Sequence, residues 1–226
     1  MSRQQTLYSI GMMFLLGMLL GGCRAERTDI STDGSTTVVD TGGLPSTQPP
    51  TATATQTVPQ QQPPDLRLEV NLAQRELYVY RSGERIDTHK VAVGSKEWPT
   101  PTGEWTISQV VWNPEWIPPN ESWAEDEEPK QPGDPDNPLG RVQLVYQLPN
   151  SIHGTNAPDS VGKAVSHGSI RVTNEVGTKL GRQVMESGGA SRDEAWFERA
   201  RANRTEKQVV EIPNPVPISV VPGKSE

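Results

Sequence analysis

The chain has 226 residues, a formal net charge of −7 and a single cysteine, Cys23. An acidic chain is a poor candidate for binding nucleic acid or anionic lipid surfaces. One cysteine cannot form an intramolecular disulfide framework, and the three histidines lack metal-binding spacing. We therefore expect no disulfide, no metal site and no cofactor.

The first residues predict export from the cytoplasm. Arg3 precedes the uncharged stretch Leu7–Leu20, which is too short to form a stable transmembrane helix. This stretch ends in Leu20-Gly21-Gly22-Cys23, which matches the bacterial lipobox, where the cysteine is lipidated and the chain is cut just before it. We predict a lipoprotein signal peptide over residues 1–22 and a lipid anchor on Cys23. The alternative is a secreted protein with a stray cysteine.

Composition then divides the rest of the chain. Residues 23–64 are rich in Thr, Pro and Gln and contain no aromatic side chain, so they have too little apolar surface to offset the entropy of ordering. We predict a disordered linker there, one domain over residues 65–222, and a tail over residues 223–226. The anchor would hold the domain on the periplasmic side of the cell envelope. By analogy with enteric sorting rules, Arg24 favours the outer membrane in a cell with two membranes.

The domain begins with strand patterns. Leu66, Leu68, Val70 and Leu72 alternate with polar residues, which indicates a half-buried strand, and Leu77–Tyr80 completes a hairpin. Glycine and proline between the strand-like runs favour an all-β sandwich or barrel. The further predicted strands are Lys90–Val93, Trp105–Val111, Val142–Tyr146, Val209–Ile212 and Ile218–Val221.

Two short helices are predicted near the end of the domain. The first runs from Asn174 to Ser187, with one apolar stripe and Gly188 as its stop. The second begins at Ser191, where Ser191 and Glu194 have the spacing of a capping box, and continues to about Asn203.

The most informative segment is Ser151–Thr173. It contains His153 and His167, each followed by glycine, and Ser169 two residues after the second histidine. Here the chain resembles the L,D-transpeptidase (YkuD-type) family, whose motif is His-Gly, a gap of about a dozen residues, and Ser-His-Gly-Cys-Ile/Val-Arg/Asn. The resemblance covers Leu66 to Val221 and includes Leu77–Tyr80, Val91–Gly94, Thr100–Gly103, Trp112–Trp116 and Asn137–Gly140.

The resemblance implies a fold, a substrate and a set of site residues. The fold would be mainly β, a YkuD-like sandwich or barrel with two short C-terminal helices, and the substrates would be peptidoglycan stem peptides. His153 would be the general base and Ser169 the nucleophile that forms an acyl-enzyme. The oxyanion and substrate pocket would be formed by Gly154, His167, Gly168 and Arg171.

One position departs from the family motif, because Ser169 stands where the family has its nucleophilic cysteine. A thiol beside a histidine is readily converted to a thiolate, whereas a serine hydroxyl must attack while a base removes its proton. Two functions follow: an L,D-transpeptidase-like acyltransferase that uses Ser169, or a non-catalytic peptidoglycan-binding lipoprotein that has lost its nucleophile.

Three further features have competing interpretations. The S-x-x-K match Ser160–Lys163 suggests a penicillin-binding type of serine enzyme, but no S-D-N or K-T-G motif accompanies it. The acidic run Glu121–Glu128 either attracts an acceptor amine or is a solvated loop. Trp112, Trp116 and Trp123 either form a lid over a cleft or pack against the sheet.

Overall fold

The computed structural model describes residues 63–223. The predicted signal peptide, Cys23, nearly all of the linker and residues 224–226 lie outside this part of the chain. Those assignments, and the domain limits 65–222, remain predictions. Within the described range no helix is both long and apolar enough to cross a membrane.

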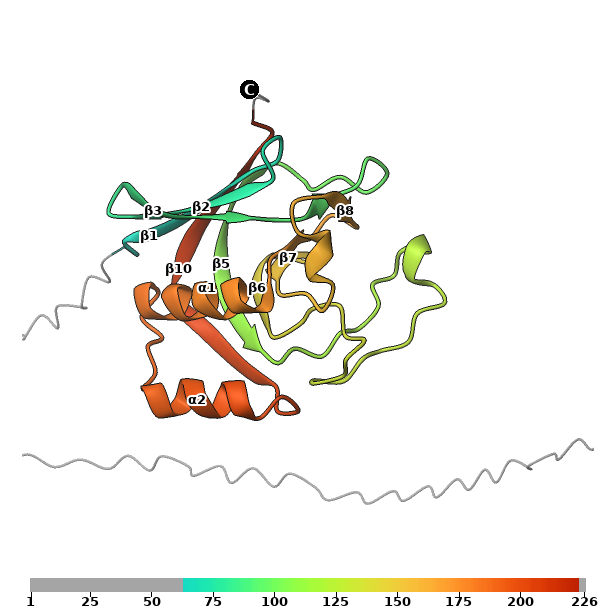
Figure 1. Ribbon diagram of the computed structural model, residues 1–226. Helices are drawn as coiled ribbons and strands as arrows, with labels where there is room; N and C mark the ends of the chain where they lie inside the picture. The colour runs from blue at the N-terminus through green and yellow to red at the C-terminus, as the bar shows by residue number, and fades with distance from the viewer. Residues whose placement is uncertain (1–62, 224–226) are drawn as a thin grey trace, which may run out of the picture. The chain divides into compact units, whose positions relative to one another are not determined.

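The described domain is mostly β, and its main sheet is curled (Figure 1). This sheet has eight strands in the order β3-β2-β1-β10-β5-β6-β7-β9. A second, two-stranded sheet pairs β4 with β8. The strands are β1 (Leu66–Asn71), β2 (Glu76–Arg81), β3 (Glu84–Lys90), β4 (Val93–Gly94), β5 (Gly103–Trp112), β6 (Val142–Gln147), β7 (Asn150–His153), β8 (Ala164–Ser166), β9 (Ile170–Arg171) and β10 (Gln208–Val221). The helices are α1 (Asn174–Ser187) and α2 (Glu194–Ala202), with short 3₁₀ helices η1 (Ser122–Ala124) and η2 (Pro158–Ser160).

Helix α1 lies across β10, β5 and β6 and covers one face of the sheet (Figure 1). Its residues Leu180 and Val184 are fully buried in the core. Gly181 faces the sheet so closely that a Cβ there would lie 3.0 Å from the side chain of Val142. The small residue thus lets the helix approach the strands, and the apolar stripe predicted from the sequence is the surface that packs.

The predicted first helix agrees with α1 at both ends. Thr173 precedes it and accepts a hydrogen bond from Val176 N at 3.2 Å, which satisfies one of the free N–H groups of the first turn. The predicted hairpin is also confirmed, since β1 and β2 pair antiparallel.

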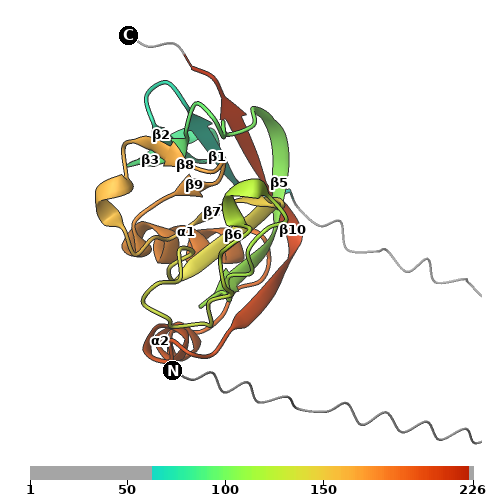
Figure 2. The same cartoon turned by 90° about the vertical axis from the view of Figure 1, so that its right-hand side faces the viewer.

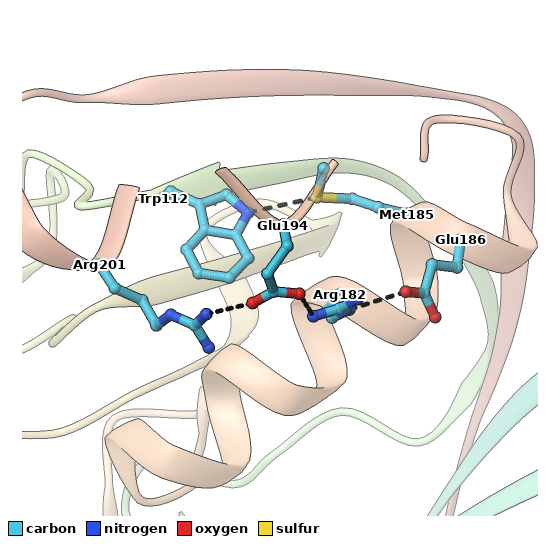
Figure 3. Close-up of polar contacts among 6 residues, drawn as sticks. All are labelled: Trp112, Arg182, Met185, Glu186, Glu194 and Arg201. Atoms are coloured by element: carbon cyan, nitrogen blue, oxygen red, sulfur yellow. Dashed lines mark hydrogen bonds and ion pairs between the residues drawn. The ribbon is translucent and has the colours of Figure 1, made fainter. Parts of the chain in front are cut away.

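The predicted capping box of the second helix is wrong. Helix α2 begins at Glu194, and its N-cap is Asp193, which accepts from Trp196 N at 2.8 Å. Glu194 does not reach back, because its carboxylate binds Arg182 and Arg201 on either side (Figure 3).

Two strand predictions are also wrong in extent. The run Lys90–Val93 is divided between two sheets, because the chain leaves β3 at Lys90 and Ala92 instead pairs with Arg171. Val209–Ile212 and Ile218–Val221 are parts of the single long strand β10, which runs beside β5 (Figure 2). The prolines between them interrupt the regular pairing between Glu211 and Val216 without ending the strand.

The long segment between β5 and β6 is anchored at its base. Trp112 is buried in the core, where its Nε1 donates to Met185 Sδ at 3.3 Å (Figure 3) and its ring contacts Phe197.

The next residue, Asn113, is buried with a φ of 48°. Its amide donates to the carbonyls of Ala200 and Asn203, both at 2.9 Å, and accepts from the guanidinium of Arg141. Trp112 is therefore a packing residue, and the segment starts and ends on a fixed support.

Candidate active site

The sheet face opposite α1 borders a cavity of about 1070 Å³. Alternation along the strands decides which side chains reach it. Val110 and Val142 lie beside Gly181 of α1, whereas their neighbours Val111 and Gln143 line the cavity. The cavity therefore extends over several strands, from β10 and β5 across to β7 and β9.

Strands β7 and β9 bring the two predicted catalytic residues to this cavity. The strands pair in parallel, with Ile152 opposite Ile170 and both fully buried in the core. His153 follows Ile152 and Ser169 precedes Ile170, so both lie on the opposite face from the isoleucines. Both line the cavity, although they are 16 residues apart in the chain.

His153 has a defined tautomer. Its Nδ1 lies 2.6 Å from the carbonyl oxygen of Gly154, and because a carbonyl can only accept, the ring proton resides on Nδ1. The side chain is 4% exposed, and this burial lowers its pKa to about 4, with the nearby Arg171 acting in the same direction and the Gly154 carbonyl opposing. The ring is therefore neutral at pH 7, and Nε2 carries the lone pair that a general base needs.

The Ser169 hydroxyl is held by the backbone. Its Oγ accepts a hydrogen bond from Ser151 N at 3.2 Å, and the Ser169 carbonyl accepts from Ser166 Oγ at 2.5 Å. Gly168 has a φ of 98°, and a Cβ there would lie 2.6 Å from Asn150 Oδ1, so this turn requires glycine. Within residues 63–223 no hydrogen bond joins the His153 ring to Ser169 Oγ, so the catalytic pair remains a prediction.

Arg171 supplies a positive charge to the same cavity. It is half-buried, and burial lowers its pKa, although the guanidinium stays charged. In the described part of the chain its side chain forms no ion pair or hydrogen bond, and the only cause of its pKa shift is burial. An unpaired guanidinium in a cavity is suited to binding a carboxylate.

His167 and two tryptophans form an aromatic stack at the cavity. The ring of Trp123 lies parallel to His167 with a centroid distance of 3.9 Å, and Trp98 meets His167 edge-on at 6.0 Å. Trp123 belongs to η1 in the long segment between β5 and β6, so the stack joins this segment to the Ser166–Ser169 turn. Of the three tryptophans considered as a lid, Trp116 and Trp123 line the cavity, and Trp112 lies in the core.

Other sequence features lie away from these residues. Of the acidic run, Glu121 and Trp123 line the cavity, while Glu125–Glu128 are exposed and do not. Ser160 and Lys163 also lie outside the cavity lining, so the S-x-x-K match is not part of this candidate site. In the part of the chain that the structure describes, no group of three or more His, Cys, Asp or Glu side chains has a metal-binding arrangement.

Ser151 and Ser166 were missed as site residues by the sequence reasoning. Ser151 acts through its backbone N–H, which no side-chain motif reveals. The strand period places side chains and not backbone N–H groups, so no pattern in the sequence indicates this contact. Ser166 is part of the motif itself, but its hydrogen bond to the Ser169 carbonyl depends on how the turn folds.

Comparisons with known proteins agree on one family. The YkuD model, described as the L,D-transpeptidase catalytic domain, matches residues 65–190. YqjB of Bacillus subtilis, a protein named for the same family, is 33% identical over 119 residues, which are 50% of this chain and 62% of that protein. The Escherichia coli protein named "Probable L,D-transpeptidase YbiS" is 32% identical over 115 residues, covering 47% of this chain and 37% of its own length.

Among solved structures, the L,D-transpeptidase from Mycobacterium smegmatis superposes with a TM-score of 0.43 and 17% identity, over 70% of this chain and 59% of that chain. The chain spans less than two thirds of the length of YqjB and of YbiS.

Proposed function

The chain belongs to the YkuD family of L,D-transpeptidase catalytic domains, and from this premise we propose that it is a peptidoglycan acyltransferase with Ser169 as nucleophile and His153 as general base. The substrates would be stem peptides of peptidoglycan. The acyl donor would be a tetrapeptide stem cut at the L,D bond after its diamino acid, and the acceptor an amine of another stem.

One observation carries this proposal: Ser169 and a neutral, oriented His153 lie on one face of adjacent strands and line one cavity. An oxygen nucleophile needs a base that is unprotonated at working pH, because the hydroxyl cannot be deprotonated in advance. The depressed pKa of His153 meets this requirement. The Ser151 N–H, which donates to Ser169 Oγ, favours negative charge on that oxygen as its proton leaves.

The reaction follows from these roles. Ser169 Oγ attacks the carbonyl carbon of the L,D peptide bond while its proton passes to His153 Nε2, and backbone N–H groups of Gly168 and Ser169 stabilise the oxyanion. The C–N bond then breaks, and the leaving amine takes the proton from His153. In the second half the acceptor amine attacks the ester, its proton passes to His153, and the Ser169 oxygen leaves and regains a proton.

Arg171 would bind a carboxylate of the stem peptide. Its guanidinium is unpaired within the described residues and close enough to His153 to lower that pKa, so a bound carboxylate would lie beside the reacting bond. Neutralising Arg171 in this way would also make the His153 imidazolium easier to form during the reaction.

Mass spectrometry tests the proposal directly. The purified domain is mixed with disaccharide-tetrapeptide, and both the intact protein and the muropeptides are measured. A Ser169 adduct or a cross-linked product is expected, and the matched control is Ser160→Ala, a serine outside the cavity. Absence of both products with a correctly folded domain would contradict the proposed chemistry.

A second function is favoured by the missing hydrogen bond between His153 and Ser169. A non-catalytic peptidoglycan-binding lipoprotein would keep the cavity and Arg171 but transfer no acyl group. Binding of stem peptides without turnover would identify this case.

The lipid anchor and the outer-membrane location belong to the same proposal. Cys23→Ser should abolish labelling by a radioactive or clickable fatty acid and release the protein from the membrane fraction.

A further inference from the structure

Asn174, the first residue of α1, bridges two segments that meet beside His153. Its Oδ1 accepts from Arg141 N at 2.8 Å, at the end of the segment that leads into β6. Its Nδ2 donates to Thr155 O at 3.0 Å and to Asn156 Oδ1 at 3.3 Å, in the turn that follows β7. A single side-chain amide therefore uses both its donor and its acceptor groups to hold the two segments together.

Two glycines make room for this amide. A Cβ on Gly140 would lie 2.1 Å from Asn174 Oδ1, and a Cβ on Gly154 would lie 2.3 Å from the same atom. Real side chains do not approach so closely, so each position requires glycine while Asn174 occupies this place. The amide is thus packed directly against the backbone of Gly154.

Gly154 carries the carbonyl that fixes the tautomer of His153. The orientation of that carbonyl depends on the peptide groups before and after it. On one side Gly154 N donates to Val142 O at 2.9 Å, a contact between backbone groups that depends on no side chain. On the other side the Thr155 carbonyl is held by Asn174. One of the two supports therefore depends on a single side chain.

The position of Asn174 at a helix start does not account for these contacts. The N-cap of α1 is Thr173, whose Oγ1 accepts from Val176 N. The Asn174 side chain instead turns to the two loop segments. Loss of the helix cap and loss of the Asn174 bridge are therefore separable by substitution.

We propose that Asn174 is a positioning residue for His153: it holds the Gly154–Thr155 turn so that the ring proton stays on Nδ1 and Nε2 remains free to accept a proton. The orientation of the ring is a property of the folded domain alone. Its consequence for acyl transfer rests on the proposed function.

Nitrogen-15 NMR of the His153 imidazole tests the orientation without any substrate. At pH 7 the wild-type ring should show a single tautomer with the proton on Nδ1. Asn174→Ala should show a mixture of tautomers, and Asn174→Asp, which keeps the acceptor for Arg141 N but loses the donor to Thr155 O, should show the same defect. Thr173→Ala is the matched control, since it weakens the start of α1 and leaves the Asn174 contacts in place; it should keep the wild-type signal.

A pH titration of the same signal adds a second readout. Arg171 is the charged group that acts on His153, and Asn174→Ala and Thr173→Ala leave it in place and add no charge. Asn174→Asp adds a carboxylate that would itself raise the pKa of the ring, so only its tautomer is compared. In Asn174→Ala the midpoint of ring protonation should move away from that of the wild type, and in Thr173→Ala it should not. If the wild-type domain acylates stem peptides, Asn174→Asp should lower kcat by about a hundredfold, as expected for a base displaced from its position.

The two proposals fail in different ways. A single Nδ1 tautomer in folded Asn174→Ala and Asn174→Asp, with an unchanged titration of Asn174→Ala, would overturn the positioning role, whatever the activity. Absence of acylation by the wild-type domain, with the expected tautomer defect in the variant, would overturn the proposed enzyme and leave the positioning role intact.

Discussion

The backbone N–H of Ser151 donates to Ser169 Oγ at 3.2 Å, across the parallel pair of β7 and β9. Ser151 is buried, so water cannot reach its N–H. The Ser169 hydroxyl is therefore the group that satisfies this buried donor. The contact links stability to chemistry: the same oxygen that satisfies a buried donor is the proposed nucleophile.

Ser169→Ala should therefore have two effects. It removes the nucleophile and abolishes the acyl adduct, and it leaves the Ser151 N–H without a partner, which lowers the free energy of unfolding by about 1–3 kcal/mol. Urea denaturation and intact-protein mass spectrometry measure the two effects. Ser160→Ala should change neither, and an adduct that persists in Ser169→Ala would place the nucleophile elsewhere.

Ser169→Cys should raise acyl transfer. A thiol ionises far more readily than a hydroxyl and is the intrinsically better nucleophile beside an imidazole. The variant should also form a covalent adduct with a carbapenem, because the strained lactam acylates a cysteine at this motif position. The adduct mass and the rate of cross-link formation are the measurements. An inert cysteine variant would show that the cavity has lost more than its thiol.

The pH dependence of acylation should reflect the buried histidine. Burial and Arg171 lower the pKa of His153 to about 4, so its base form is present at all higher pH values. We expect kcat/KM for acylation by the wild-type domain to stay level from pH 7 to pH 5 and to fall as the pH drops through about 4. A decline centred near 6.5, the ordinary histidine pKa, would contradict a base buried in this way.

The same pKa makes stability depend on pH. The unfolded chain takes up a proton on this histidine near pH 6.5, whereas the folded domain does so only near pH 4. Between these values the unfolded state binds more protons, so the contribution of His153 to stability falls by about 3 kcal/mol as the pH falls, and this contribution does not change further below pH 4. His153→Gln lacks this titration. As the pH falls from 6.5 to 4, the unfolding free energy of the wild type should therefore decrease relative to that of the variant.

Arg171→Gln should weaken the binding of stem peptides. The guanidinium has no carboxylate partner within residues 63–223, so its removal breaks no internal ion pair. A charge-assisted hydrogen bond contributes about 1.5–3 kcal/mol, which corresponds to a rise in Kd or KM of roughly 10- to 100-fold. Isothermal titration with the tetrapeptide stem measures it. Arg201→Gln, which alters the surface ion pair with Glu194, is the control and should leave binding unchanged.

Local patterns predicted the elements whose packing is decided by nearby residues. The alternation in Leu66–Leu72 was sufficient to predict β1, and the apolar stripe and the glycine stop were sufficient to predict α1. Each of these elements buries one face, which the pattern of apolar residues marks. The short strands β7, β8 and β9 were not predicted, since two to four residues form strands only when a neighbouring strand supplies their hydrogen bonds. Strand β10 was divided at its prolines because the sequence does not show that β1 and β5 flank it on both sides.

The amino-acid sequence by itself determined the family, through the residues around His153 and Ser169, and it determined which chemical groups are available, because side-chain identity needs no fold. Only the tertiary structure decided that burial keeps His153 neutral and that Ser151 N–H reaches Ser169 Oγ. It also decided that the Asn174 side chain binds the turn that follows His153. These properties depend on desolvation and on distances between residues far apart in the chain, and such distances exist only after the strands have paired.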